Sequence, residues 1–454
     1  MSSDLHSRPT AADARDSAGP QPSRGAPGAS HVRWHILLLL GVIAGLTFLD
    51  RLNLSIAGKH IQDEFAFSTE TMGWILSAFV LGYALFQVPG GWLGDRLGPR
   101  GVLTTAILFW SAMTAATALA PRLPMVQWLG VAWSFAVVRF LVGVGEGVVF
   151  PNISRMTAFW MSARERGIAS SLWLVGVGAA GMVTPLLVAR TSERWGWRAS
   201  FHLCAAIGLV IALVWRLYAT DHPEDHPRVS PAELEAIHAG RTGPGRGTIA
   251  APTPWRKMFS NLSVWGLVLS YFFIAYPAYV FYTWFFIYLV RVRGLSVAQG
   301  SLWASAPFIA IALLAPIGGW VSDHAVARLG KRRGRQVAVT FGATASALLM
   351  WVGGHAANNT AAILLLAGAA GFNLFAVATW WAASNDLTRQ HAGALSGMMN
   401  MVGNFGGWLC PIVTGYIAAR LGWAQALDFA AVVTVSSGVF WMLIDAGQDL
   451  DAFG

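Results

Sequence analysis

Charged side chains are scarce in this sequence of 454 residues. Asp, Glu, Lys and Arg together make up 12% of the chain, which is about half of the roughly 25% found in soluble globular domains. Hydrophobic residues account for 55% of it, and the mean hydropathy is +0.53. This composition excludes an ordinary water-soluble domain and indicates a protein that is embedded in a lipid bilayer.

Cysteine and the usual signatures of enzymes are also nearly absent. The two cysteines, Cys204 and Cys410, fall inside apolar runs, so the sequence indicates neither a disulfide framework nor a pair of metal ligands. We find no metal-ligand cluster, nucleophile elbow or phosphate loop. The segment GVGAAG at 176–181 has the spacing of a dinucleotide fingerprint, but no strand precedes it, so we interpret it as a close-packed helix face. We expect no enzymatic activity, no metal and no cofactor.

The net charge of +9 would suit a nucleic-acid partner if the basic residues were gathered on one face. They are instead scattered in short loops without interleaved aromatic residues. We therefore expect no nucleic acid as a partner, and we attribute the positive charge to membrane topology.

Long apolar segments are what the chain has in abundance. A helix needs about 20 apolar residues to cross a hydrocarbon core about 30 Å thick. Twelve such segments predict an all-α membrane protein with both ends on the same side of the bilayer. The predicted spans are 34–57, 70–92, 101–120, 127–158, 167–190, 199–219, 262–290, 301–321, 336–354, 360–383, 392–418 and 424–444.

Lys and Arg are unevenly divided between the two sets of loops. The loops on the side of the N-terminus hold most of them, including the run from Lys331 to Arg333, whereas the opposite loops are sparser. Cytoplasmic loops carry an excess of Lys and Arg. We therefore expect both termini to be cytoplasmic and the protein to be a multi-pass protein of the cell membrane.

Polar stretches divide the chain into five parts. Residues 1–33 are rich in Ser, Ala, Pro and Asp and are expected to form a disordered cytoplasmic tail. A six-helix half at 34–219 is followed by a cytoplasmic linker at 220–261, a second six-helix half at 262–445 and a cytoplasmic tail at 446–454.

An internal repeat relates the two halves. The segment GGWLGD at 90–95 recurs as GGWVSD at 318–323. A constant offset of 226 residues aligns further positions, which are Gly167 with Gly393, Pro185 with Pro411, and Gly196-Trp197 with Gly422-Trp423. Repeated halves with a substrate site between them near the midplane are typical of secondary transporters.

Ionisable residues interrupt two of the predicted spans. Asp50 and Arg51 stand side by side in the first, although a charge at the bilayer centre costs about 2.5–3.5 kcal/mol. Arg139 and Glu146 lie seven residues apart in the fourth, on one helix face and about 10 Å from each other. That distance leaves room for a substrate or for a partner from another helix. The alternative is a set of static ion pairs, such as Asp50 with Arg51 or with Arg139.

The segment GWLGDRLGPR at 91–100 resembles the signature of the major facilitator superfamily. Four further segments are similar to the anion:cation symporter family within it. They are FLDRLNLSIA at 48–57, RFLVGVGEGVVFPNISRMTAFWMSARERG at 139–167, FYTWFFIYL at 281–289 and NMVGNFGGWLCPIVTGYI at 400–417. The resemblance implies two pseudo-symmetric six-helix halves and the uptake of an organic anion driven by a cation, usually the proton.

The resemblance also implies roles for individual residues. By motif position, the protonatable acids are Asp50 and Glu146, the intramembrane cations are Arg51 and Arg139, and the polar pair of the eleventh helix is Asn400 and Asn404. Trp173 and Leu174 depart from the pattern, because some members that carry sugar acids have a polar residue there. Which of the two arginines anchors the substrate carboxylate stays open, although the planar fork of guanidinium suits the task and we favour Arg51.

Other polar residues in the spans are candidates for substrate binding. Tyr83 and Gln87 lie one turn apart in the second span, and Tyr279, Tyr282, Asn400 and Asn404 come from the second half. Buried amides must find partners, so these residues are equally suited to join helices to one another.

A short polar turn follows the second span. We predict that Asp95, Arg96 and Arg100, together with Asp323 in the repeat, form a conformational latch. Such a latch holds the halves in one state and releases them in another.

The sequence therefore favours a proton-coupled symporter of an organic anion that works as a monomer by alternating access. Sugar acids such as hexonates and hexuronates are the first choice of substrate, and aromatic carboxylates, suggested by the 22 tryptophans, are the second. Proton-driven efflux of drugs is a weaker alternative because Arg51 and Arg139 would repel cations. A sensor or channel that no longer cycles is a third reading.

Overall fold

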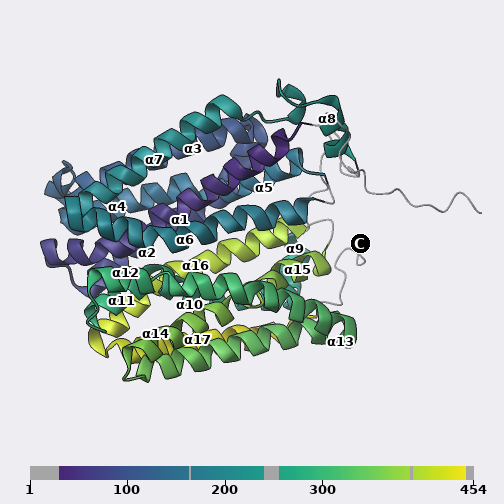
Figure 1. The fold of residues 1–454 in the computed structure, drawn as a ribbon. Helices are drawn as coiled ribbons and strands as arrows, with labels where there is room; N and C mark the ends of the chain where they lie inside the picture. The colour runs from purple at the N-terminus through teal and green to yellow at the C-terminus, as the bar shows by residue number, and fades with distance from the viewer. Residues whose placement is uncertain (1–29, 163–164, 240–254, 389–391, 446–454) are drawn as a thin grey trace, which may run out of the picture.

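The computed structural model describes residues 30–162, 165–239, 255–388 and 392–445. Its regular structure in these residues is helical, and the helices form two halves that lie side by side (Figure 1). The purple-to-teal half comes from the first part of the chain and the green-to-yellow half from the second. The described chain begins and ends at the same end of the bundle (Figure 1).

The elements follow one another in two comparable series. The first half consists of α1 (Val32–Phe65), α2 (Thr69–Leu97), α3 (Pro99–Leu119), η1 (Ala120–Arg122), α4 (Val126–Gly147), α5 (Val149–Trp160), α6 (Arg166–Trp195) and α7 (Trp197–Tyr218). The connection holds η2 (Pro223–Asp225), α8 (Pro231–His238) and α9 (Trp255–Ser260). The second half consists of α10 (Leu262–Thr283), α11 (Phe285–Arg291), α12 (Val297–Trp303), α13 (Ala306–His355), α14 (Asn359–Asn373), α15 (Val377–Leu387), α16 (Ala392–Arg420) and α17 (Trp423–Trp441).

Ten stretches of described helix are long and apolar enough to cross a membrane. One of them, Val297–His355, has 59 residues and makes two passes, because the chain turns at Gly330. A Cβ added to Gly334 would meet the backbone of Ala325 and Val326, which shows that the two arms lie against each other. With α16, a further helix of 29 residues, every predicted span corresponds to a helix.

The repeat seen in the sequence extends to the backbone of the turns. Gly196 and Gly422, which correspond at the offset of 226 residues, have φ values of +82° and +104°. Gly98 and Gly330, after the two copies of the GGW motif, have +82° and +77°. Side chains other than glycine rarely adopt this left-handed region. Each half therefore reverses direction by the same local means.

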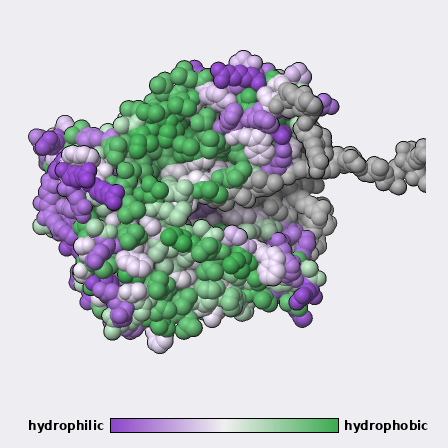
Figure 2. Space-filling model, in the orientation of Figure 1, coloured by the Kyte–Doolittle hydropathy of each residue, from purple (hydrophilic) through white to green (hydrophobic). Residues whose placement is uncertain are grey.

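Apolar side chains cover the middle of the bundle and polar ones its two ends (Figure 2). Large hydrophobic side chains are exposed there, such as Val432 of α17 at 65% and Val210 of α7 at 62%. Large exposed apolar areas mark a surface that water does not cover, which fits hydrocarbon as the solvent. Figure 2 also shows a recess where the two halves meet.

Glycines bring α2 and α4 into close contact. A Cβ on Gly82 would meet the carbonyl oxygen of Phe140, and one on Gly143 would meet that of Phe79. Small residues of this kind allow membrane helices to approach at the level of the backbone. The consequence for the site is that Tyr83 and Glu146, on neighbouring turns of these two helices, share one interface.

The expected linker is ordered where it leaves the first half. Glu233 of α8 accepts hydrogen bonds from the Ser30 hydroxyl at 2.5 Å and from the backbone N–H groups of Val32 and Arg33 at 3.1 and 3.0 Å. The first N–H groups of a helix have no partner within it. Glu233 therefore caps α1 from a distant part of the chain.

The two halves are joined mainly away from the described chain ends. Asp63 at the end of α1 forms an ion pair with Arg291, and Arg420 donates to Glu70 at 2.9 Å. The Ser55 hydroxyl donates to the carbonyl oxygen of Thr283 at 2.6 Å. The bundle is thus closed at the end opposite the termini.

The α2–α4 contact leads to a first prediction. Gly143→Ala places a Cβ against the Phe79 backbone, and overpacking of this kind costs about 1–3 kcal/mol. We expect a lower thermal unfolding midpoint for the detergent-purified variant. Gly101→Ala in α3 is the control, because nothing lies within 4 Å of its added Cβ. Equal midpoints for the two variants would contradict the close approach.

Candidate functional site

The structure brings the four intramembrane ionisable residues together inside the first half. Asp50 and Arg51 come from α1, and Arg139 and Glu146 come from α4. Asp50 and Arg139 are each 1% exposed and Glu146 is fully buried. None of these three therefore faces lipid, and the two helices enclose them as the high cost of lipid-exposed charge demands.

Arg51 and Glu146 form the central ion pair. The Nε atom of Arg51 donates to Oε2 of Glu146 at 3.2 Å. The partner of Glu146 is thus supplied by another helix, as the seven-residue spacing from Arg139 allowed. Nη2 of Arg51 and Oε1 of Glu146 are buried without a hydrogen-bond partner, so this pair retains capacity for a further polar group.

Aromatic rings surround the Arg51 guanidinium. Its central carbon lies 4.2 Å from the ring centre of Tyr83, 5.1 Å from that of Phe48 and 5.2 Å from that of Phe79. A cation over an aromatic face gains about 0.5–2 kcal/mol, more when water is excluded. The rings surround the guanidinium and restrict its position.

Asp50 takes no part in the ion pair of Glu146, although the two carboxylates lie within reach of each other's charge. It faces Arg139 of α4, and Trp110 and Thr114 of α3. Arg139 sits 5.1 Å from the ring centre of Phe79, and its Nε and Nη1 atoms have no hydrogen-bond partner. Arg139 therefore lies within reach of the charges of both acids, whereas Arg51 forms its ion pair with Glu146 and not with its sequence neighbour Asp50.

The predicted polar residues of the two halves meet in one chain of hydrogen bonds. Tyr279 donates to Asn404 at 2.9 Å, and Asn404 donates to the carbonyl oxygen of Asn400 at 2.8 Å. Asn400 in turn donates to Gln87 of α2 at 2.6 Å. These residues therefore join helices in this state, which was one of the two roles expected for them.

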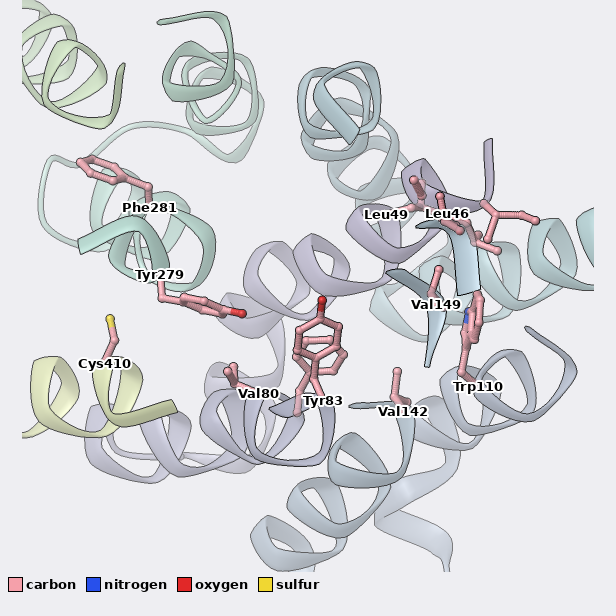
Figure 3. Packing of buried hydrophobic residues seen from close by; sticks show 14 of the residues in the cluster. Leu46, Leu49, Val80, Tyr83, Trp110, Val142, Val149, Tyr279, Phe281 and Cys410 are labelled. Atoms are coloured by element: carbon pink, nitrogen blue, oxygen red, sulfur yellow. The ribbon is translucent and has the colours of Figure 1, made fainter. Parts of the chain in front are cut away.

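Two tyrosine hydroxyls point into the space between the halves. Figure 3 shows the hydroxyl groups of Tyr83 from α2 and Tyr279 from α10 directed into the region between these helices. Tyr282, the third predicted tyrosine, packs between Phe48 and Phe308, with ring centres 5.7 and 5.8 Å apart. Hydroxyls and aromatic faces from both halves thus border the Arg51 side of the site.

The first three predicted latch residues find partners in the first half and in the connection that follows it. Asp95 forms an ion pair with Arg155 of α5. The backbone N–H of Arg100 donates to Asp221 at 2.7 Å, and its guanidinium donates to the carbonyl oxygen of Arg216 at 2.7 Å. Arg96 lies over the Trp92 ring at 4.4 Å.

The second half has a related cluster that sequence reasoning missed. Asp386 of α15 pairs with Lys331 at 2.9 Å and with Arg335 at 2.7 Å, whereas the predicted Asp323 is exposed. The basic run at 331–335 was a signal for such a cluster, but its acid lies 51 residues away from Arg335.

Other partners of the site were also missed. Asn53 donates to the sulfur of Cys204 at 3.3 Å and accepts from the Ser200 hydroxyl at 2.7 Å, so it ties α1 to α7. Trp110 and Thr114 carried no signal, because single Trp and Thr residues are common in membrane helices. Trp173 packs on Phe150, with ring centres 5.4 Å apart, and the side chain of Leu174 lies outside the described residues.

The protein has two helical halves of one topology, and buried acids and arginines lie between helices of the first half. These features are typical of a multi-pass membrane transporter of the secondary type. The family model of the Major Facilitator Superfamily matches residues 40–409. The chain belongs to the Major Facilitator Superfamily, and it is a transporter rather than an enzyme.

Curated relatives agree with the expected branch of this superfamily. The chain is 32% identical over 389 residues to the probable sulfoacetate transporter SauU of Cupriavidus necator, covering 85% of this chain and 88% of that protein. It is 30% identical to the probable galactarate/D-glucarate transporter GarP of Escherichia coli K12 and to the D-galactonate transporter of Escherichia coli O6:H1, in each case over 91% of this chain and 95% of the other. The resemblance to the anion:cation symporters is confirmed.

Solved structures share the fold. A bacterial homologue of the human lysosomal transporter Spinster, in an inward-facing conformation, matches with a TM-score of 0.73 at 18% identity, over 92% of this chain and 97% of that one. The D-xylose–proton symporter matches with a TM-score of 0.67 at 16% identity, over 92% and 99%. The predicted fold class is confirmed.

The geometry predicts strong coupling between Arg51 and Glu146. Removing one partner of a buried ion pair leaves the other charge unpaired, which costs about 3–5 kcal/mol. We expect Arg51→Gln and Glu146→Gln each to lower the thermal unfolding midpoint markedly, and the double variant to fall by less than the sum of both. Additive losses in this double-mutant cycle would show that the pair is not formed.

Proposed function

We propose that the protein takes up an organic anion together with protons by alternating access. The observation that carries the proposal is the buried pair of Arg51 and Glu146, in which the guanidinium keeps one unpartnered nitrogen. The Arg51 guanidinium is held by a protonatable acid and faces hydroxyl groups from both halves. It can therefore exchange the Glu146 carboxylate for the carboxylate of a substrate.

Competition for Arg51 would couple the two solutes. While Glu146 is ionised, it occupies the guanidinium at 3.2 Å. Protonation of Glu146 removes its charge, which frees Arg51 to bind the substrate carboxylate in a two-point contact. Loss of the proton on the other side of the membrane restores the ion pair and expels the anion. Asp50, opposite Arg139, serves as a second proton site in this scheme.

Uptake of the anion with at least one proton also fits membrane energetics. Moving one uncompensated charge against the membrane potential costs about 2.3 kcal/mol per 100 mV. We infer that both termini are cytoplasmic, so the recess between the halves faces the cytoplasm in this state. The ion pairs of Asp95 and Asp386 would then control the exchange between states from that side.

A sugar acid is the substrate that the site supports best. Tyr83, Gln87, Tyr279, Asn400 and Asn404 offer donors and acceptors to substrate hydroxyls. Relatives at 30% identity are named as galactarate/D-glucarate and D-galactonate transporters. An aromatic carboxylate is the second candidate, because Tyr282 stacks on Phe308 and meets Phe48 edge to face, and the Phe48 ring lies beside Arg51.

Drug efflux is less compatible with the same geometry. Both buried acids have an arginine beside them, since Arg51 pairs with Glu146 and Arg139 faces Asp50, so neither acid is left free to bind a lipophilic cation. The described residues hold no group of three or more His, Cys, Asp and Glu side chains that could bind a metal ion. The unpartnered nitrogen of Arg51 favours an anion as the solute.

Uptake in proteoliposomes tests the proton coupling. We expect a pH gradient, alkaline inside, to stimulate accumulation of a radiolabelled sugar acid from a panel of sugar and aromatic acids. Asp50→Asn and Glu146→Gln should each abolish the stimulation, because neither amide binds and releases a proton. Accumulation that ignores the gradient in the wild type, or transport of cations alone, would reject symport.

The role of Arg51 has its own test. Arg51→Lys keeps the charge but replaces the planar fork with a point charge. We expect the apparent KM for the anion to rise at least tenfold, which corresponds to about 1.4 kcal/mol of lost binding free energy. Arg198→Lys, at the exposed ion pair with Glu64, is the matched control and should leave the KM unchanged. An unchanged KM in Arg51→Lys would assign the carboxylate to another residue.

A further inference from the structure

The first part of the connection between the halves is docked on one end of the first half (Figure 1). We call residues 219–238 the docked segment. Its Asp221 accepts a backbone N–H of α3 at 2.7 Å, and its Glu233 accepts those of α1 at 3.1 and 3.0 Å. The indole of Trp160, at the end of α5, donates to the carbonyl oxygen of Thr220 at 3.2 Å. The docked segment thus contacts the ends of α1, α3 and α5, and it continues directly from α7.

One histidine of the docked segment is buried and uses both of its ring nitrogens. His226 is 6% exposed. Its Nε2 atom lies 3.1 Å from the carbonyl oxygen of Tyr218 at the end of α7, and its Nδ1 atom lies 3.2 Å from the backbone nitrogen of Arg228. A backbone N–H only donates and a carbonyl oxygen only accepts. Nδ1 therefore accepts and Nε2 carries the hydrogen, so the docked arrangement requires a neutral imidazole.

Protonation of this imidazole opposes docking. A proton on Nδ1 would remove the lone pair that accepts from Arg228 and would set two N–H groups against each other. Aromatic rings close other sides of the imidazole, since the ring centres of Tyr218 and Trp160 lie 5.2 and 5.8 Å from its own. A buried charge is costly unless it is paired and hydrogen-bonded. The charged form of His226 is therefore favoured outside this site.

The ionisable groups around His226 agree with this reasoning. Burial is the largest influence and lowers the pKa of His226 below its ordinary value, Arg228 acts in the same direction, and Glu233 acts against both. His35 of α1 lies beyond Tyr218, whose hydroxyl it meets at 2.9 Å. A group whose pKa is lower in the docked state stabilises that state only above the pKa of the free group. Docking should therefore lose stability as the pH falls below about 6.5.

We propose that the docked segment is a pH-sensitive switch, in which neutral His226 holds it on the first half and protonated His226 releases it. Release would free the ends of α1, α3 and α5 from the contacts that the segment supplies. The inference goes beyond the proposed function, because docking needs no substrate. Under that function, protons arrive with the anion at the cytoplasmic end, so the switch would respond to the proton that is transported.

Thiol labelling of the purified full chain measures the docking equilibrium. Ile237 of α8 is fully buried, whereas Glu235 of the same helix is exposed. The thiol in Ile237→Cys reacts with a maleimide only when the segment opens, and the thiol in Glu235→Cys gives the rate of an exposed group at the same pH. The ratio of the two rates therefore reports the fraction of open segment. The native Cys204 and Cys410 are both buried.

The expected result is a ratio that depends on pH through His226. We expect the ratio of the Ile237→Cys rate to the Glu235→Cys rate to rise about tenfold from about pH 7.5 to about pH 5.5, because a free imidazole gains its proton in this interval. In a His226→Gln background the ratio should stay within about twofold, because an amide does not titrate. His226→Asn is a second neutral replacement and should behave in the same way.

The other histidines near the docked segment provide matched controls. His238 lies on α8 as well, but it is exposed and meets Glu224 at 2.8 Å. His222 packs on Phe159 of α5, with ring centres 4.7 Å apart. His238→Gln, His222→Gln and His35→Gln should each keep the tenfold rise. A rise that disappears in one of these controls and persists in His226→Gln would assign the response to that histidine and overturn the inference.

Two further results would reject the switch. A ratio that stays constant between the two pH values shows that protonation does not release the segment, and a ratio near one at both shows that the segment is not docked. The labelling needs neither substrate nor a proton gradient. Its failure would leave the proposed symport intact, and failure of uptake in proteoliposomes would leave the switch intact.

Discussion

The buried ion pair between Arg51 and Glu146 is the interaction on which the arrangement of the first half depends. A charge in a low-dielectric interior is tolerated only with a partner, so α1 and α4 must present these two side chains to each other. The contact of α2 with α4 at Gly82 and Gly143 places the Tyr83 ring over the guanidinium. The close packing of α2 on α4 therefore helps to position the groups that surround the buried ion pair.

The two halves share a topology but contribute different kinds of polar side chain to the site. The first half supplies acids and arginines from α1 and α4, whereas α10 and α16 supply neutral donors and acceptors such as Tyr279, Asn400 and Asn404. Under the proposed function, this division lets the first half bind the charge of the anion while the second half contacts its hydroxyl groups. A symmetric fold thereby yields an asymmetric site.

The connections between the halves combine exposed ion pairs with polar contacts at the level of the site. The pair of Arg420 and Glu70 is partly exposed, and exposed ion pairs contribute only about 0–1 kcal/mol each. The hydrogen bond between Asn400 and Gln87 crosses the interface at the level of the site. The halves are also packed closely at the closed end, where a Cβ on Gly73 of α2 would meet the carbonyl oxygen of Pro411 of α16. Separation of the halves at this end would therefore have to break apolar packing as well as these polar contacts.

The sequence alone determined the class of this protein, its membrane spans and its two-half topology. Hydropathy marked the spans, and the repeated motifs with their turn glycines marked the two halves. These properties follow from local composition and from a bilayer of fixed thickness. The sequence also marked Asp50, Arg51, Arg139 and Glu146, since charge in an apolar span is costly wherever it points. Only the tertiary structure decided that Glu146 pairs with Arg51, that Asp50 faces Trp110 and Thr114, and that Asp386 meets Arg335. Such pairings depend on the rotation and approach of neighbouring helices, which arise from packing between residues far apart in the chain.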